Sequence, residues 1–201
     1  MLYKTELTIL KLLFEDLTKG YSIRELSLIL KLPYPQIHRT ISSLKKKDLI
    51  KKQQQGKSWI INLNLENVRD DYIAVEMERK KEIIHTYKTL NLLIKDLERV
   101  SFNQFVCILF GSYAEKRAKK ESDLDLLFVI PEDYNYEQFE KAIKNAITLP
   151  NLDLNITTEK GLTEMWSNPL KLNVGNELLK KHVILYGAEQ FLRLRRKYYV
   201  G

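Results

Sequence analysis

The sequence has little of what secreted and membrane-embedded proteins need. Cysteine occurs once among 201 residues, which excludes a disulfide framework. This residue, Cys107, lies inside the apolar run 105–110, so we expect a buried thiol rather than a ligand or a nucleophile. No apolar run approaches the roughly 20 residues that cross a bilayer, and residues 1–11 lack the layout of a secretory signal. We therefore expect a cytoplasmic protein with no membrane contact.

Glycine is also scarce. None of the seven glycines forms a Walker loop or a dinucleotide fingerprint, so those phosphate-binding chemistries are poorly supported. Charged residues make up 29% and hydrophobic residues 44%, which is ordinary for globular proteins and does not indicate disorder. A chain of this length and composition suits two small domains, each with a modest core.

The positive charge is concentrated in the first third of the chain. Residues 1–65 hold twelve Lys or Arg against five Asp or Glu, so the whole net charge of +7 lies there. Such a surplus suits a protein that contacts phosphate backbones. A solubilising surface would account for the charge alone equally well.

Residues 1–65 show the pattern of three helices followed by a hairpin. Apolar residues recur at helical spacing over 5–17, and Ser22 with Glu25 makes a capping box that begins a second helix ending near Lys31. Pro35 suits the first turn of a third helix. Two strands, 49–54 and 58–63, are predicted on either side of a turn at residues 55–57. The core candidates of this hairpin are Ile50, Trp59 and Ile61.

This order of elements resembles the winged helix-turn-helix domains of prokaryotic regulators. In that family the third helix enters the major groove of DNA and the wing reaches a neighbouring groove or phosphates. The alternative is a winged helix that makes protein contacts only. The resemblance implies DNA binding through residues whose types suit base edges and phosphates: Gln36, Arg39, Thr40, Ser43, Lys46, Lys47 and Lys57.

Residues 66–100 form a helical connector in this interpretation. From 68 to 100 the chain has no Pro or Gly and mixes charged with apolar residues, which predicts one long or two shorter helices. These helices could pair two copies of the chain in a homodimer or pack against the C-terminal domain, and the sequence favours neither. His85 has no second ligand nearby, so we expect no metal there.

The C-terminal region, 101–201, combines a phosphate-type turn with three carboxylates. Gly111 and Ser112 end a predicted buried strand, and we expect a helix from Tyr113 to Lys119. Asp123 and Asp125 share one face of the next strand, because side chains alternate along a strand. Asp153 takes the equivalent face of a later strand. Two carboxylates at ~5 Å repel by roughly 3 kcal/mol, so the cluster favours a bound Mg²⁺ or Mn²⁺.

Together these residues resemble the DNA polymerase beta-like nucleotidyltransferase superfamily, closest to its minimal members. The family pattern is Gly-Ser, about ten residues, Asp-x-Asp, then a later Asp. The resemblance implies an α+β fold with a small mixed sheet and transfer of a nucleoside monophosphate from a nucleoside triphosphate, ATP above all. Catalytic and metal-binding roles would go to Asp123, Asp125 and Asp153, and phosphate binding to Gly111 and Ser112. The residues 115–117, Glu-Lys-Arg, depart from the small residues common after Gly-Ser.

Two functions compete at this point. The first is an active nucleotidyltransferase coupled to DNA binding, whose acceptor would be a protein hydroxyl, since minimal nucleotidyltransferases often resemble antitoxins that adenylylate a partner toxin. The second is a transcription regulator that uses an inactive or nucleotide-sensing nucleotidyltransferase fold. Turnover on labelled ATP separates the two.

Overall fold

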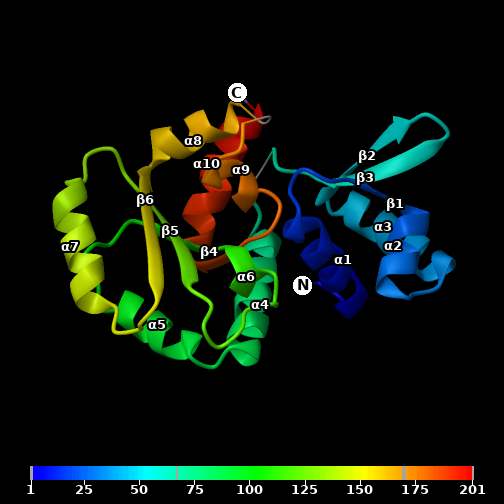
Figure 1. Ribbon diagram of the computed structural model, residues 1–201. Helices are drawn as coiled ribbons and strands as arrows, with labels where there is room; N and C mark the ends of the chain where they lie inside the picture. Colours follow the sequence, from blue (N-terminus) through cyan, green and yellow to red (C-terminus); the bar gives the residue numbers. More distant parts are fainter. Residues whose placement is uncertain (1, 67, 169–170, 201) are drawn as a thin grey trace.

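The computed structural model describes residues 2–66, 68–168 and 171–200, which form two lobes joined by helix α4 (Figure 1). The N-terminal lobe holds three helices and a three-stranded antiparallel sheet of order β1-β3-β2. Its elements are α1 (Lys4–Glu15), β1 (Tyr21–Ser22), α2 (Ile23–Leu30), α3 (Tyr34–Lys46), β2 (Ile50–Gln55) and β3 (Ser58–Leu63). The three predicted helices and both hairpin strands are confirmed, and the short β1 was not predicted.

Local sequence signals explain where these elements begin and end. Ser22 Oγ accepts from the Glu25 amide at 3.2 Å, and the Glu25 carboxylate accepts from the Ser22 amide at 2.7 Å, so the predicted capping box is present. Lys31 ends α2 in the left-handed conformation, and Pro35 occupies the first turn of α3. Gly56 takes a positive φ of 59° at the hairpin turn, where glycine carries no steric penalty.

The prediction that Trp59 belongs to the core is wrong. Ile50 and Ile61 are buried, but 46% of Trp59 is exposed. Trp59 lies on the same face of β3 as Ile61, two residues nearer the hairpin tip, and the hairpin projects beyond the helices there (Figure 1). Its ring instead lies against Lys52, with the Nζ atom 4.6 Å from the ring centroid.

The connector is two helices, α4 (Asp70–Thr86) and α5 (Leu90–Leu97), one of the two arrangements predicted. Helix α4 belongs to both cores: Tyr72 and Val75 are buried in the N-terminal lobe, and Ile83 is buried in the C-terminal lobe. These apolar residues pack within the chain. They are therefore not free for a dimer interface, although other faces of the connector are.

The C-terminal lobe is a four-stranded mixed sheet of order β6-β5-β4-β7 covered by helices on both faces. Strands β5 and β6 are parallel, whereas β4 runs antiparallel to both β5 and β7. The elements are β4 (Val106–Leu109), α6 (Gly111–Ala114), β5 (Leu124–Ile130), α7 (Tyr136–Ala146), β6 (Leu152–Thr158), α8 (Glu159–Trp166), α9 (Val174–Leu178), β7 (Val183–Tyr186) and α10 (Ala188–Val200). The mixed α+β architecture is as predicted, and Cys107 is buried in β4.

Alternation along β5 divides its side chains between the two cores. Leu126 and Phe128 face the core that contains α5 and α7, whereas Leu127 and Val129 face the core beneath α8, α9 and α10. Asp125 has the parity of the second set. Its carboxylate therefore emerges at the end of the sheet face that α8, α9 and α10 cover.

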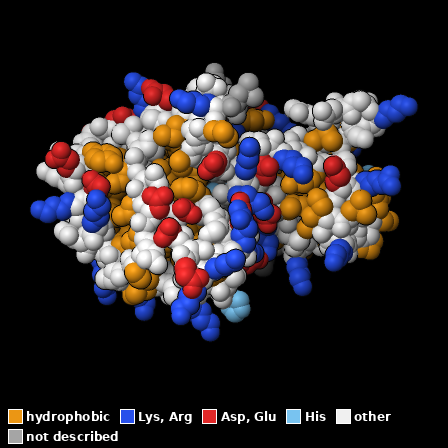
Figure 2. Space-filling view, viewed as in Figure 1, with side chains coloured by type: hydrophobic (Ala, Val, Ile, Leu, Met, Phe, Trp, Pro, Cys, Tyr) orange, Lys and Arg blue, Asp and Glu red, His pale blue; other side chains and the backbone are white. Residues whose placement is uncertain are grey.

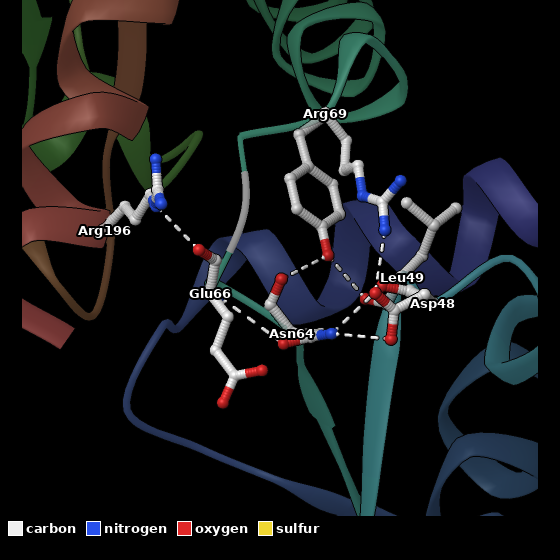
Figure 3. Close-up of polar contacts among 7 residues, drawn as sticks. Asp48, Leu49, Asn64, Glu66, Arg69 and Arg196 are labelled. Carbon is white, nitrogen blue, oxygen red and sulfur yellow. Dashed lines mark hydrogen bonds and ion pairs between the residues drawn. The ribbon is translucent and has the colours of Figure 1, made fainter. Parts of the chain in front are cut away.

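The two lobes are tied together at several places. The Leu17 amide donates to the Leu179 carbonyl at 2.7 Å, and Arg196 Nε of α10 donates to the Glu66 carbonyl at 2.6 Å. The start of α4 is bonded to the N-terminal sheet, because the buried Tyr72 hydroxyl lies 2.7 Å from the Leu49 carbonyl, before β2, and 2.7 Å from the Asn64 carbonyl, after β3. Figure 3 shows Leu49 and Asn64 there, with Arg196 bonded to Glu66. Within the three described stretches, no helix is long and apolar enough to cross a membrane.

Candidate active site

The Gly-Ser turn directly follows β4, and the side chain of Asp125 defines its geometry. Gly111 has a φ of +63°, and a Cβ atom built on it would lie 2.0 Å from Asp125 Oδ2. The Phe110 amide also donates to the Asp125 carbonyl at 3.1 Å. Two features require glycine at position 111. The backbone is left-handed there, and the Asp125 carboxylate occupies the space that a side chain would fill. The turn and the carboxylate therefore form one unit.

The predicted helix from Tyr113 to Lys119 is wrong in both bounds. Helix α6 covers only Gly111–Ala114, and the chain leaves it through Lys116, which has a φ of +58°. The Glu115 amide donates to the Gly111 carbonyl at 3.1 Å, and the Arg117 amide donates to the Ser112 carbonyl at 3.0 Å. These bonds close a compact turn. The chain therefore forms no extended helix here whose free amide groups could face an anion.

The structure brings the three aspartates to one edge of the sheet. Asp125 and Asp153 are direct register partners on the parallel strands β5 and β6, and Asp123 comes just before β5. Asp125 is half-buried, whereas Asp123 and Asp153 are exposed. Asn155 Nδ2 donates to Asp153 Oδ1 at 3.3 Å. The half-buried member thus stands between the Gly111 turn and a second, solvent-facing carboxylate.

Burial and neighbouring negative charge both disfavour the ionised form of Asp125. Burial raises the pKa of its carboxyl group, and the negative charges of Asp153, Asp123 and Glu177 raise it further. Glu177 belongs to α9, so the cluster consists of four carboxylates when Asp125 itself is counted. Figure 2 shows acidic side chains gathered over the area where β5, β6 and α9 meet. A cation bound there would relieve this repulsion.

Glu177 is a residue that sequence reasoning missed. It is exposed on the five-residue helix α9. The side chains of two asparagines, Asn173 and Asn176, hold this helix against the chain that follows α8. Asn173 accepts from the Asn176 amide at 2.8 Å, and Asn176 Nδ2 donates to the Asn168 carbonyl at 2.7 Å. No spacing motif links Glu177 to the aspartates, because the fold alone brings α9 to the sheet.

The donor set fits a hard divalent cation, since carboxylate oxygens are the ligands that Mg²⁺ and Mn²⁺ prefer. In the part of the chain that the structure describes, no three His, Cys, Asp or Glu side chains are grouped so as to hold a metal ion as they stand. A metal site built on Asp123, Asp125 and Asp153 would need these side chains to turn towards a common centre.

The predicted DNA-binding residues of α3 divide into two groups. Gln36 Nε2 donates to Thr5 Oγ1 at 3.1 Å, while Ser43 Oγ and Lys47 Nζ each donate to Glu6 at 2.7 Å. Thr40 is half-buried on the same side and donates to the Gln36 carbonyl. This stripe of α3 faces α1 and fixes the two helices together, which the prediction did not foresee.

The other polar stripe of α3 is exposed. It carries Arg39 and Lys46 of the predicted set, and Lys57 is exposed at the hairpin tip. A pocket of roughly 450 Å³ lies between this stripe and the β2–β3 hairpin. Its polar lining residues include three lysines and Ser42, which is outside the predicted set. They are His38, Ser42, Lys45, Lys46 and Lys52.

Comparison with known protein families gives a match in the C-terminal lobe. A family model described as a nucleotidyltransferase domain matches residues 90–185, a range that includes the Gly-Ser turn, all three aspartates and Glu177. This match supports the nucleotidyltransferase part of the prediction, and nucleotide transfer as the general class of chemistry. Searches of curated proteins and of solved structures gave no match.

Proposed function

We propose that this protein is a metal-dependent nucleotidyltransferase that moves a nucleoside monophosphate from a nucleoside triphosphate, ATP in the first instance, to an acceptor hydroxyl. The observation that carries the proposal is the register pairing of Asp125 with Asp153 beside Gly111. Two carboxylates meet there, and the glycine leaves the backbone of the turn without a side chain of its own. The family match over residues 90–185 supports the same chemistry.

In this proposal each residue of the site has a defined task. Gly111 and Ser112 hold the terminal phosphates, with the Ser112 hydroxyl as donor. Asp123 and Asp125 hold the divalent cations, which when bound neutralise the triphosphate and lower the pKa of the acceptor hydroxyl. Asp153 orients the acceptor and takes its proton. The acceptor oxygen then bonds to the α-phosphorus, the bond from that phosphorus to the bridging oxygen breaks, and pyrophosphate leaves.

We further propose that the acceptor is a protein hydroxyl on a toxin-like partner, with this chain as the antitoxin. The resemblance to minimal nucleotidyltransferases motivates this choice of acceptor. The test is incubation of the protein with labelled ATP, Mg²⁺ and the products of neighbouring genes. One of these products should become labelled by the wild type but not by Asp123→Ala. An equal signal from both proteins, or none from the wild type, would contradict the proposal.

The N-terminal lobe is proposed to be a winged helix-turn-helix domain that binds DNA, with two copies of the chain on two half-sites. The exposed stripe of α3 supports this role because Lys45 and Lys46 line one pocket together with Lys52 of the hairpin, and Lys57 is exposed at the hairpin tip. DNA affinity that falls steeply with salt is expected, and mass measurement with and without DNA would reveal the dimer. Flat salt dependence would count against the domain's role.

A second candidate function is a transcription regulator that binds nucleotide without turnover. It is favoured by the aspartates as they stand, since among the described residues no three acidic, His or Cys side chains are grouped to hold a metal ion. It predicts that nucleotide shifts DNA affinity while no acceptor is labelled. Labelling experiments and DNA titrations on one preparation distinguish the two candidates directly.

A further inference from the structure

The two lobes meet at a small pocket of about 80 Å³ beside the Gly-Ser turn. Helix α1, helix α4, the turn after α6 and the start of β7 all contribute to its lining. Figure 2 shows basic and acidic side chains mixed in the band between the lobes. The charged lining residues are Lys11, Glu15, Arg79, Glu82, Lys116 and Lys181, with Glu115 at the turn.

Glu82 of α4 holds one lysine from each side of this pocket. Lys11 of α1 donates to Glu82 Oε1, and Lys116 Nζ lies 3.9 Å from Glu82 Oε2. The Glu82 side chain is 43% exposed and that of Lys116 is 52% exposed. A single carboxylate thus bridges the first helix of the N-terminal lobe and the turn that follows the candidate phosphate site.

One end of the bridge is fixed to the candidate nucleotide site. Lys116 lies between Glu115 and Arg117, whose amides donate to the carbonyls of Gly111 and Ser112. Its own amide donates to the Tyr113 carbonyl at 3.0 Å. Because these bonds close the turn, a ligand that moves Gly111 or Ser112 also moves the backbone of Lys116.

The other end of the bridge is fixed to α3. Lys11 lies on α1, and the same helix carries the buried Glu6, which is 2% exposed and accepts from Ser43 and Lys47. Helix α1 therefore contacts α4 through one charged residue and α3 through another. A shift of α1 changes the position of α3, whose opposite stripe is the candidate DNA surface.

We propose that the bridge Lys11–Glu82–Lys116 couples nucleotide occupancy at the Gly-Ser turn to the position of α1, and through α1 to α3. Without nucleotide, Glu82 shares its charge between the two lysines. A triphosphate at the turn carries more negative charge than a carboxylate and attracts Lys116, so Glu82 is left to Lys11 alone. Coupling of this kind is reciprocal, so DNA on α3 changes nucleotide affinity by the same factor.

This inference rests on the proposed nucleotide site, and the experiment separates the two. Amide hydrogen exchange of residues 4–15 is measured with and without Mg²⁺ and α,β-methylene ATP, a non-hydrolysable analogue. In the wild type, nucleotide should change exchange of these amides by about two- to fivefold, as expected for partly exposed ion pairs. In Glu82→Gln the change should disappear.

The matched control is Glu140→Gln on α7. Glu140 pairs with Lys144 on the same helix, 2.7 Å away. Its side chain is about as exposed as that of Glu82, and it does not line the pocket between the lobes. This variant should respond like the wild type. Calorimetric titration reports nucleotide binding independently. Binding without an α1 response, or a full response in Glu82→Gln, overturns only the coupling, whereas absence of binding overturns the coupling and the proposed function together.

Discussion

The carboxylate of Asp125 fills the space that a side chain on Gly111 would occupy, with Oδ2 only 2.0 Å from the position of an added Cβ atom. This relationship joins the end of β4 to the start of β5 and places the half-buried acid of the site against the turn proposed to hold phosphates. Substitutions at the two positions should therefore affect stability in different ways.

Gly111→Ala should lower the free energy of unfolding by about 3 kcal/mol, because left-handed strain and overpacking against Asp125 act together. Gly56→Ala is the matched control. It shares the positive φ, at 59°, but no atom lies within 4 Å of its added Cβ. Denaturant unfolding of the control should show a loss of only about 1–2 kcal/mol. Equal losses in the two variants would show that Asp125 does not press on Gly111.

Asp125→Asn should stabilise the metal-free protein by at most about 1 kcal/mol after solvent screening, because it removes a charge that burial and the neighbouring carboxylates disfavour. The raised pKa of Asp125 means that the folded state disfavours its charged form. This group's contribution to stability therefore falls as pH rises from 3.8 towards the raised value, and stays low above it. Thermal unfolding at neutral pH should show a melting temperature higher by at most about 2–4 °C.

Mg²⁺ provides the control for that variant. It should raise the melting temperature of the wild type, because it binds the folded carboxylates, and should have less effect on Asp125→Asn. A destabilised Asp125→Asn without metal would show that the carboxylate serves the fold rather than a ligand.

Lys46 and Lys47 are neighbours in the sequence, but their substitution by Gln should have different effects. Lys46→Gln should act mainly on DNA affinity, and Lys47→Gln mainly on the free energy of unfolding. Loss of the exposed Lys46 should reduce the slope of log affinity against log salt by about one, with a stability change within about 0.5 kcal/mol. Lys47 lies against the buried Glu6. Burial would raise the pKa of Glu6, but hydrogen bonds from Lys47, the Tyr3 amide and Ser43 lower it overall.

Lys47→Gln therefore removes a cation from a buried carboxylate, and we expect it to cost about 1–3 kcal/mol of unfolding free energy. Fluorescence anisotropy with duplex DNA and chemical denaturation measure the two effects separately. The assignment of the exposed stripe would be wrong if Lys47→Gln weakened DNA binding more than Lys46→Gln while leaving stability intact.

His182 should make the protein less stable in mild acid. Burial lowers the pKa of this fully enclosed imidazole, although the nearby Glu76 acts in the opposite direction. The unfolded chain takes up a proton as pH falls through 6.5 while the folded state does so only at lower pH, so stability declines across that window. His182→Gln should flatten the pH dependence of unfolding between pH 7 and 5.

Local signals in the sequence were enough to predict much of the fold. The capping box of Ser22 and Glu25 places the start of α2, and period-two alternation places Asp125 opposite Leu126, because both depend on neighbouring residues only. The helix predicted over 113–119 does not form beyond Ala114 because Lys116 adopts the left-handed conformation. No feature of the local composition predicts that conformation.

Tertiary packing explains the remaining misses. An amphipathic helix such as α3 has two polar flanks, and the sequence cannot show which flank α1 covers, so the predicted DNA-binding set includes Ser43 and Lys47, which the fold bonds to Glu6 of α1. The hydrophobicity of Trp59 predicts a core position, yet the β2–β3 hairpin extends past the core and leaves this side chain 46% exposed. Glu177 comes from a different segment, and only the fold brings it near Asp125.

The origin of the transferred phosphate tests the central claim most directly. The protein, Mg²⁺ and its candidate acceptor would be incubated in parallel with ATP labelled at the α-phosphate and with ATP labelled at the γ-phosphate. A nucleotidyltransferase should label the acceptor from the α-position only, and Asp125→Asn should abolish that signal. Label from the γ-position, or α-label that survives in Asp125→Asn, would contradict the account.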